Sequence, residues 1–238
     1  MRGLWIALAF LTRIPVPRVD ATADMFARSV SYYPLIGLAV GVIVAAAGWT
    51  GAWLHPWIGA LAALLAWVWV TGALHLDGLG DLADGLGASH GDRTRLLAVM
   101  ADPHIGSFGV VAVVLQLLCK LVMLSLLLPG HWLAIILIPA VARLGPLFWA
   151  KYLLPLRPGG LGAAMAGAVQ RGDLLIWALV FALACFVFPW LAIAPVILAV
   201  IGFWFRWRTG GVTGDMHGAG IEIAESLLLL ACVVQAAR

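Results

Sequence analysis

Charged side chains are scarce in this sequence, which has only 14 Lys or Arg and 11 Asp or Glu among its 238 residues. A soluble domain is nearer one quarter charged, whereas 64% of this chain is hydrophobic. Several apolar runs approach the ~20 residues that a helix needs to cross a bilayer, so the sequence predicts an integral membrane protein. Little polar chain remains for a separate soluble domain, and we expect one membrane domain over residues 1–238.

Cysteine is equally rare. Cys119, Cys185 and Cys232 lie inside apolar runs without paired spacing, which gives little support to a disulfide or a zinc site. A signal peptide is also not evident, because the first apolar run is short and leads into "TRIPVPR" rather than into small cleavage-site residues.

Seven apolar runs are candidate spans, namely residues 34–54, 57–72, 107–128, 132–150, 174–188, 191–205 and 223–236. The last two are short enough to be re-entrant or tilted. The opening run has only about ten apolar residues before Arg13, so we expect an interfacial or re-entrant segment there. The predicted fold is all-α, a polytopic bundle of about seven transmembrane spans.

Charge is distributed unevenly over the connections between these runs. The connections at "WLHPW", "LPGHW" and "FPWL" contain no charged residue, while the alternate connections hold 11 of the 14 basic residues. The positive-inside rule assigns that face to the cytoplasm, together with the N-terminus and the acidic residues. Membrane orientation thus accounts for the net charge of +3 without a nucleic-acid partner.

The stretch "HLDGLGDLADGLG" at 75–87 concentrates three carboxylates. Asp77, Asp81 and Asp84 stand at i, i+4 and i+7, on one face of a helix that we expect to continue the 57–72 span. Like charges at this spacing repel, and a Mg²⁺, Mn²⁺ or Ca²⁺ ion would offset the repulsion. The interleaved glycines would leave room for a phosphate group. A merely solvated helix end is the alternative.

Two later segments add candidate ligands. In "MADPHIGSFG", Asp102 would supply a fourth carboxylate, although Asp102 and Ser107 equally suit N-terminal caps of the next helix. In "RTGGVTGDMHGAG", a glycine-rich loop with Thr213, Gly214 and Asp215 runs into the last span, an arrangement that suits phosphate binding by backbone N–H groups.

Lys120 and Arg143 lie within apolar runs, where an ionisable side chain is costly and usually faces the interior or a watery cavity. Both suit a cavity that receives an anionic substrate, although Arg143 is close enough to its span's end to snorkel. With His75 and His104 beside the acidic motifs, these residues indicate metal-assisted phosphoryl transfer at the cytoplasmic face.

The chain resembles the cobalamin synthase family, the adenosylcobinamide-GDP ribazoletransferases. The segments that carry the resemblance are "FLTRIPVP" at 10–17, "YYPLIGLAVG" at 32–41, "HLDGLGDLADG" at 75–85, "LLAVMADPHIGSFG" at 96–109, Lys120, "VAR" at 141–143 and "GGVTGDMHGA" at 210–219. The resemblance implies a Mg²⁺-dependent enzyme of the bacterial inner membrane that joins adenosylcobinamide-GDP to α-ribazole or its 5′-phosphate and releases GMP.

The resemblance also implies roles for individual residues. Asp77, Asp81, Asp84 and Asp102 match the family's acidic positions and are the expected catalytic residues and metal ligands, one of them also the general base. The expected substrate contacts are Arg13, Arg28, His75, His104, Ser107, Lys120, Arg143, Thr213, Gly214 and Asp215. The bilayer is the other expected partner, and the sequence leaves a homo-oligomer open.

Three other readings are weaker. A CDP-alcohol phosphotransferase would carry an Ala-Arg pair three residues after the first "DG", and "DGLGDLADG" contains no Arg. A transporter would distribute polar groups through the membrane depth, whereas here they gather on one face. A structural scaffold has no use for three carboxylates on one helical face.

Overall fold

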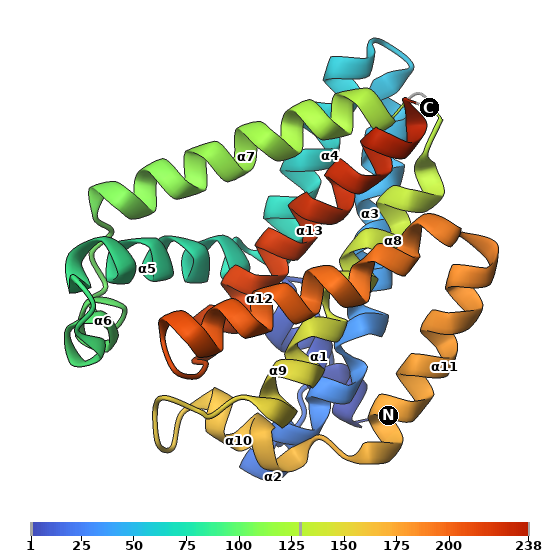
Figure 1. Cartoon of the computed structure of the whole chain (residues 1–238). Coiled ribbons are helices and arrows are strands. Elements are labelled where there is room, and N and C mark those ends of the chain that lie inside the picture. Colours follow the sequence, from blue (N-terminus) through green and yellow to red (C-terminus); the bar gives the residue numbers. More distant parts are fainter. Residues whose placement is uncertain (1, 129, 238) are drawn as a thin grey trace.

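The structure is a computed structural model that describes residues 2–128 and 130–237. This part of the chain is almost entirely helical, and its only β-type pairing is an isolated bridge between Pro155 and Val212. Five helices are long and apolar enough to cross a membrane, or up to seven spans if each of two bent helix pairs counts as one. The prediction of a polytopic helical bundle is confirmed (Figure 1).

The first half of the chain contains α1 (Arg2–Leu11), α2 (Ala23–Arg28), η1 (Ser29–Tyr32), α3 (Tyr33–Ala52), α4 (Pro56–Thr71), α5 (Leu74–Ser89), α6 (Arg93–Val99) and α7 (Ser107–Leu127). The second half contains α8 (Trp132–Ala142), α9 (Leu144–Tyr152), α10 (Leu161–Ala168), α11 (Arg171–Val187), η2 (Pro189–Ile193), α12 (Ala194–Arg208) and α13 (Gly214–Ala236).

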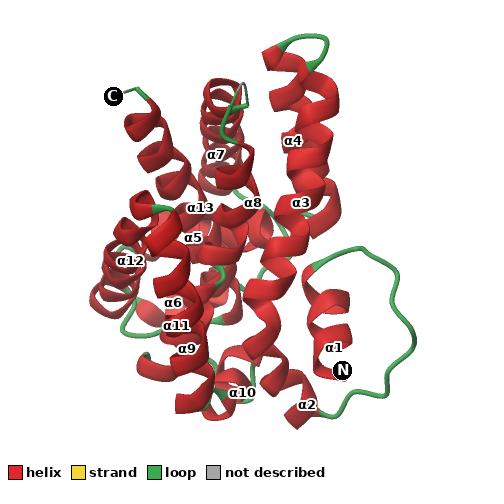
Figure 2. Ribbon diagram, turned by 90° about the vertical axis from the view of Figure 1, so that its right-hand side faces the viewer, coloured by secondary structure: helices red, strands yellow, loops and turns green. Residues whose placement is uncertain are grey.

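Helix α1 is too short to cross a bilayer, as the sequence predicted for the opening run. It has 10 residues and packs against α2, η1 and α3. Residues 12–22, which connect it to α2, form no regular structure and loop out from the bundle (Figure 2).

Glycines let helix α3 pack closely between α4 and α8. A Cβ at Gly41 would collide with the backbone of Ile136 on α8, and a Cβ at Gly51 would collide with the backbone of Gly59 on α4. Small residues at such contacts are the usual device by which membrane helices approach each other without help from water.

The expectation that the helix over 57–72 continues through the aspartates is wrong. Helix α4 ends at Gly72 and Ala73, whose φ values of 61° and 60° are left-handed, and α5 departs at 85° to α4. Leu74 is the only exposed large apolar side chain of α5, while Leu79 and Leu86 are half-buried. Asp77 is exposed, so the outer side of this helix lacks the continuous apolar surface of a lipid-facing helix. We therefore place α5 outside the membrane-spanning segments, packed against α6, α7 and α13.

Helix α13 is longer than the expected last span over 223–236. It begins at Gly214, where the Thr213 hydroxyl accepts a hydrogen bond from the Met216 N–H at 3.2 Å. Gly210 and Gly211 thus lie in the short connection that leads into the helix, and Gly214, Gly218 and Gly220 lie in its first turns. Gly218 packs against His75, so these turns fit closely against α5. In Figure 1, α13 passes through the middle of the bundle, and it contacts α5, α7, α8, α9 and α12.

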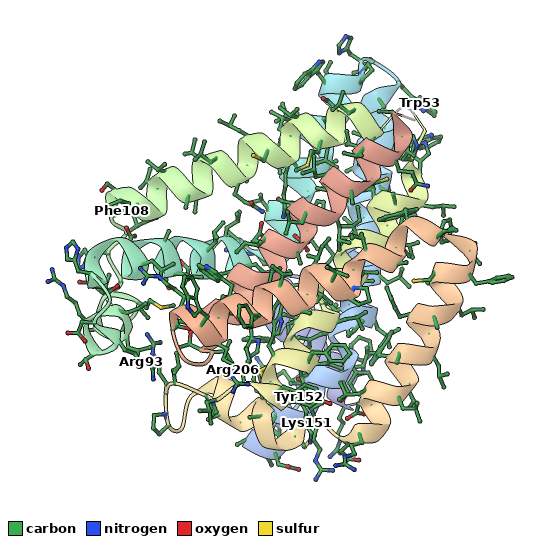
Figure 3. The ribbon with its side chains drawn as sticks, in the orientation of Figure 1. Trp53, Arg93, Phe108, Lys151, Tyr152 and Arg206 are labelled. Atoms are coloured by element: carbon green, nitrogen blue, oxygen red, sulfur yellow. The ribbon has the colours of Figure 1, made fainter. Side chains whose placement is uncertain are left out.

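The charge-rich connections gather at one end of the bundle. Figure 3 shows Arg93, Lys151 and Arg206 toward that end and Trp53 at the opposite end. This arrangement agrees with the alternation of charged and uncharged connections. That the charged end faces the cytoplasm stays a prediction from the positive-inside rule.

Candidate active site

Two helices bring three carboxylates together at the charged end of the bundle. A Cβ at Gly78 would collide with the carbonyl oxygen of Asp215, so the side of α5 next to Asp77 and Asp81 lies against the first turn of α13. Asp77, Asp81 and Asp215 thereby form what we call the carboxylate site. The spacing within the sequence predicted the first two, and the third comes from the glycine-rich segment.

Repulsion within the carboxylate site is visible in the pKa of Asp81. Partial burial, together with the negative charges of Asp77, Asp215 and Asp84, raises this pKa to about 6, and Arg157 acts in the opposite direction. The acidic charge of the site therefore exceeds what its neighbours neutralise, which favours binding of a cation.

Arg157 is the cation beside these carboxylates, and the sequence analysis did not single it out. Its Nη1 donates to Asp215 Oδ2 at 3.1 Å, and its Nη2 donates to the carbonyl oxygen of Leu97 at 3.1 Å. Both side chains of the ion pair are about one third exposed. Arg157 lies in the connection between α9 and α10, and no motif marks it, so the sequence offered no signal beyond its charge.

Asp84 has a different task from Asp77 and Asp81. It is buried, and its two carboxylate oxygens accept hydrogen bonds from the N–H groups of Gly106 at 2.7 Å and Gly109 at 2.8 Å. It thus satisfies free N–H groups at the start of α7 and adds a negative charge at the positive end of the helix dipole. Its expected role as a metal ligand stays a prediction, and both of its oxygens are already hydrogen-bonded.

Asp102 lies apart, in the exposed loop between α6 and α7. Its Oδ1 accepts from the His104 N–H at 2.9 Å and lies 2.7 Å from His104 Nδ1, and these hydrogen bonds lower the pKa of Asp102. Neither Asp102 nor Ser107 caps α7: Gly106 is the N-cap residue, and the carboxylate that binds there is Asp84. The structure does not bring Asp102, His104 or Ser107 to the carboxylate site.

Lys120 and Arg143 are paired with glutamates inside the bundle. Lys120 Nζ donates to Glu222 at 2.7 Å and to Glu225 at 2.6 Å, and Arg143 Nη1 donates to Glu225 at 2.9 Å. We call these four residues the buried charge network. Arg143 is fully buried, so the snorkelling alternative is wrong. The expected contact of both cations with an anionic substrate stays a prediction, because their charges are already matched by two carboxylates.

His75 connects the two regions. Its Nδ1 lies 3.4 Å from Arg143 Nη2, and the residue also lines a cavity of about 120 Å³ beside Asp77 and Asp215. Gly214 lines the same cavity, and Thr213 caps the helix that carries it.

The other two expected arginines lie elsewhere. The Arg13 N–H donates to the Val70 carbonyl at 2.8 Å, and its side chain packs over Gly72 at the break between α4 and α5. Arg28 forms an exposed ion pair with Asp24 at 3.1 Å on α2.

The glycines of α5 serve helix packing rather than leaving room for a phosphate group. A Cβ at Gly85 would meet Met100 of the segment after α6, and one at Gly87 would collide with the Phe108 ring of α7. With Gly78 against α13, three of these glycines fix the position of α5. This packing of α5 determines where the carboxylates of Asp77 and Asp81 lie.

Comparison with known proteins identifies the same family that the sequence resembles. The model of a family described as cobalamin-5-phosphate synthase matches residues 3–233. The chain belongs to this family.

Relatives in this family match almost the whole chain. An adenosylcobinamide-GDP ribazoletransferase of Novosphingobium aromaticivorans is 51% identical over 98% of this chain and 97% of its own length. A protein with the same description from Thiobacillus denitrificans is 46% identical over 97% of this chain and 94% of its own length. Another from Laribacter hongkongensis is 48% identical over 98% of this chain and 97% of its own length. No solved structure matches the chain.

The donor set fits a hard divalent cation that is completed by substrate. Within residues 2–128 and 130–237, no three His, Cys, Asp or Glu side chains are close enough to hold a metal ion among themselves. Mg²⁺, however, is typically bound by one or two protein carboxylates, with waters and substrate phosphates as its other ligands. Asp77, Asp81 and Asp215 offer oxygen ligands and an excess of negative charge of this kind.

Proposed function

We propose that this cobalamin-5-phosphate synthase family member transfers the cobinamide-phosphoryl group of adenosylcobinamide-GDP to α-ribazole or α-ribazole 5′-phosphate. The products are GMP and adenosylcobalamin or its 5′-phosphate. The observation that carries the proposal is the carboxylate site beside Arg157, in a chain that matches named ribazoletransferases nearly from end to end.

In the proposed reaction, a ribose hydroxyl of α-ribazole attacks the phosphorus nearer cobinamide. The bond from that phosphorus to the bridging oxygen breaks, and GMP leaves with the electron pair. A carboxylate of the site that the metal ion leaves free takes the proton of the attacking hydroxyl, and Asp81, partly buried beside Asp77 and Asp215, suits this role of general base. Arg157 pairs with Asp215 in this structure. With a substrate phosphate bound beside this pair, its guanidinium would also donate to the phosphate and stabilise the negative charge there.

Mg²⁺ is the proposed cofactor, held by one or two of the carboxylates of Asp77, Asp81 and Asp215 together with the substrate phosphates. Bound there with the diphosphate, it would neutralise phosphate charge and stabilise the charge on the leaving phosphate. The chain's own contribution is to hold these carboxylates in place through the close packing of α5 and α13.

We also propose that the protein lies in the bacterial inner membrane with its N-terminus and the carboxylate site on the cytoplasmic side. The gathering of basic connections at that end supports this orientation. The corrinoid substrate would then approach from the cytoplasm, over the exposed side of Asp77.

The test is turnover by the purified protein in nanodiscs. Adenosylcobinamide-GDP and α-ribazole 5′-phosphate are supplied together and singly, and GMP and the corrinoid product are identified by chromatography and mass spectrometry. We expect GMP and the joined corrinoid in equal amounts, and only when both substrates are present. GMP release without α-ribazole 5′-phosphate, or turnover of a CDP-alcohol instead, would contradict the proposal.

A further inference from the structure

The cavity beside the carboxylate site is mostly apolar. It has a volume of about 120 Å³ and lies between α1, α3, α5, α9, α10 and α13. Its apolar lining is Phe10, Leu11, Leu74, Pro146, Met165 and Ile221. Asp77, which is exposed, and Asp215 line the same cavity, so its polar side is the carboxylate site.

Two residues that line the cavity carry buried polar atoms without a hydrogen-bond partner in the described protein. They are the Tyr33 hydroxyl and both ring nitrogens of His217, on side chains that are 3% and 4% exposed. An unpaired buried polar group costs about 1–3 kcal/mol, so two of them beside one cavity point to a ligand that supplies the missing partner.

We infer that this cavity is the subsite for the aromatic base of the acceptor nucleoside, the benzimidazole of α-ribazole; the inference rests on the proposed function. The size supports it. The volume of about 120 Å³ is of the same order as that of a cavity of about 150 Å³ that takes up benzene, and it is far too small for a corrin macrocycle.

The polarity of the cavity separates this base from the guanine of the other substrate. Guanine carries O6, N7 and an amino group, which are more polar atoms than the apolar part of the lining can pair. A benzimidazole nucleoside has an apolar methyl-bearing ring and one free ring nitrogen that accepts a hydrogen bond. The Tyr33 hydroxyl, or an N–H of His217, is the donor that such a nitrogen needs.

Packing against Trp149 fixes the orientation of the His217 ring. The His217 ring stacks on Trp149 with 6.1 Å between ring centroids and 19° between planes. A base in the cavity leaves its ribose at Asp77 and Asp215, where the attacking hydroxyl is required. The subsite therefore delivers the acceptor to the same carboxylates that the proposed reaction uses.

The first test is binding of α-ribazole alone, measured by isothermal titration calorimetry on the protein in nanodiscs with EDTA and without corrinoid. We expect Tyr33→Phe to weaken binding by about tenfold, since it removes the hydrogen bond to the one free ring nitrogen of the base, and His217→Leu tests the alternative donor in the same way. Ser226→Ala is the matched control. It removes another buried hydroxyl without a partner, on the same helix as His217 but outside the cavity lining, and binding is expected to be unchanged.

The second test separates recognition from structure. Tyr33→Phe is expected to raise KM for α-ribazole 5′-phosphate about tenfold and to leave KM for adenosylcobinamide-GDP within about twofold of wild type. Its thermal stability is expected to be unchanged or higher, because the variant removes an unpaired buried hydroxyl. If His217→Leu does not fold, Tyr33→Phe carries the test by itself.

The outcomes distinguish the two proposals. If wild type binds α-ribazole and turns it over, but both variants bind it equally well, the subsite is wrong and the proposed function stands. If wild type neither binds α-ribazole nor forms product, the proposed function fails and the subsite fails with it. Weaker binding of Tyr33→Phe or His217→Leu, with Ser226→Ala unchanged, supports the subsite.

Discussion

The protein holds two clusters of charged side chains, and they differ in whether the charges balance. In the buried charge network, the two cations Lys120 and Arg143 face the two anions Glu222 and Glu225 at 2.6–2.9 Å. Lys120 Nζ also lies 4.3 Å from the centroid of Trp67. Every charge has a partner within the protein, as expected for ionisable groups buried inside a membrane bundle.

In the carboxylate site, by contrast, three aspartates share one arginine. Arg157 pairs with Asp215, and the pKa of Asp81 is raised to about 6 by partial burial and by the carboxylates around it. The two clusters therefore differ in net charge. The balanced charges of the buried charge network suit a structural role, whereas the excess negative charge of the carboxylate site suits binding of a cation. Unbalanced negative charge raises the cost of ionising the site and favours the binding of a cation from outside.

The largest expected effect is a loss of stability when the buried charge network loses one of its carboxylates. Glu225→Gln leaves Lys120 and Arg143 with one anion between them, and removing one partner of a buried ion pair costs about 3–5 kcal/mol. Unfolding in detergent micelles measures the loss. Adding Lys120→Met restores equal numbers of charges and is expected to recover part of the stability. A Glu225→Gln protein as stable as wild type would show that the network is not structural.

The next effect concerns activity rather than stability. Asp81→Asn is expected to lower kcat/KM on the order of 100-fold, about 2.7 kcal/mol of transition-state stabilisation, because it removes the proposed base and one of the three carboxylates of the site. The matched control is Asp20→Asn, an exposed aspartate in the loop before α2, which is expected to retain wild-type activity. Equal activity of the two variants would remove Asp81 from the chemistry.

A smaller effect is expected at Arg157. Arg157→Gln is expected to reduce kcat/KM about tenfold, since it removes a charge-assisted contact to phosphate, and Arg157→Lys is expected to retain part of the activity. Steady-state kinetics of the three proteins measure this series. Full activity of Arg157→Gln would show that the arginine only neutralises Asp215.

The smallest effect is the dependence of stability on pH. Because the folded-state pKa of Asp81 is raised from 3.8 to about 6, ionising this group disfavours the folded state at neutral pH, and the cost disappears as pH falls through 6 toward 3.8. In EDTA, Asp81→Asn is thus expected to gain about 1 kcal/mol at pH 8, after discounting for solvent screening.

That gain corresponds to a rise in Tm of about 2–4 °C. Thermal scans at pH 8 and at pH 4 measure it, and the difference between the two proteins is expected to vanish at pH 4. A variant that is less stable than wild type at pH 8 would contradict the repulsion inferred for the carboxylate site.

Much of the fold follows from the sequence, because the bilayer demands long apolar helices and the chain has few other ways to use such runs. The end of α4 at Gly72 has a local signal, since a left-handed glycine commonly ends a helix, but the 85° turn that follows could not be predicted. It depends on a left-handed Ala73, a conformation that an alanine rarely adopts, and on the Arg13 N–H that binds the Val70 carbonyl at the same point. Both are consequences of tertiary packing.

The site was predictable where its residues are close in sequence. The i, i+4 spacing placed Asp77 and Asp81 on one face of a helix. Asp84 has the same pattern but binds the start of α7, over 20 residues away. The partners of Lys120 lie more than 100 residues further on, so its pairing could not be read from any local pattern.

The central claim is that the unbalanced carboxylates bind Mg²⁺ for phosphoryl transfer. It is tested most directly by a Mg²⁺ titration of GMP release from adenosylcobinamide-GDP and α-ribazole 5′-phosphate, with wild type and Asp81→Asn at equal concentrations of folded protein. We expect a saturable rise from a negligible rate in EDTA for wild type, and a much weaker response for Asp81→Asn. A wild-type rate that is the same in EDTA and in Mg²⁺ would contradict the account.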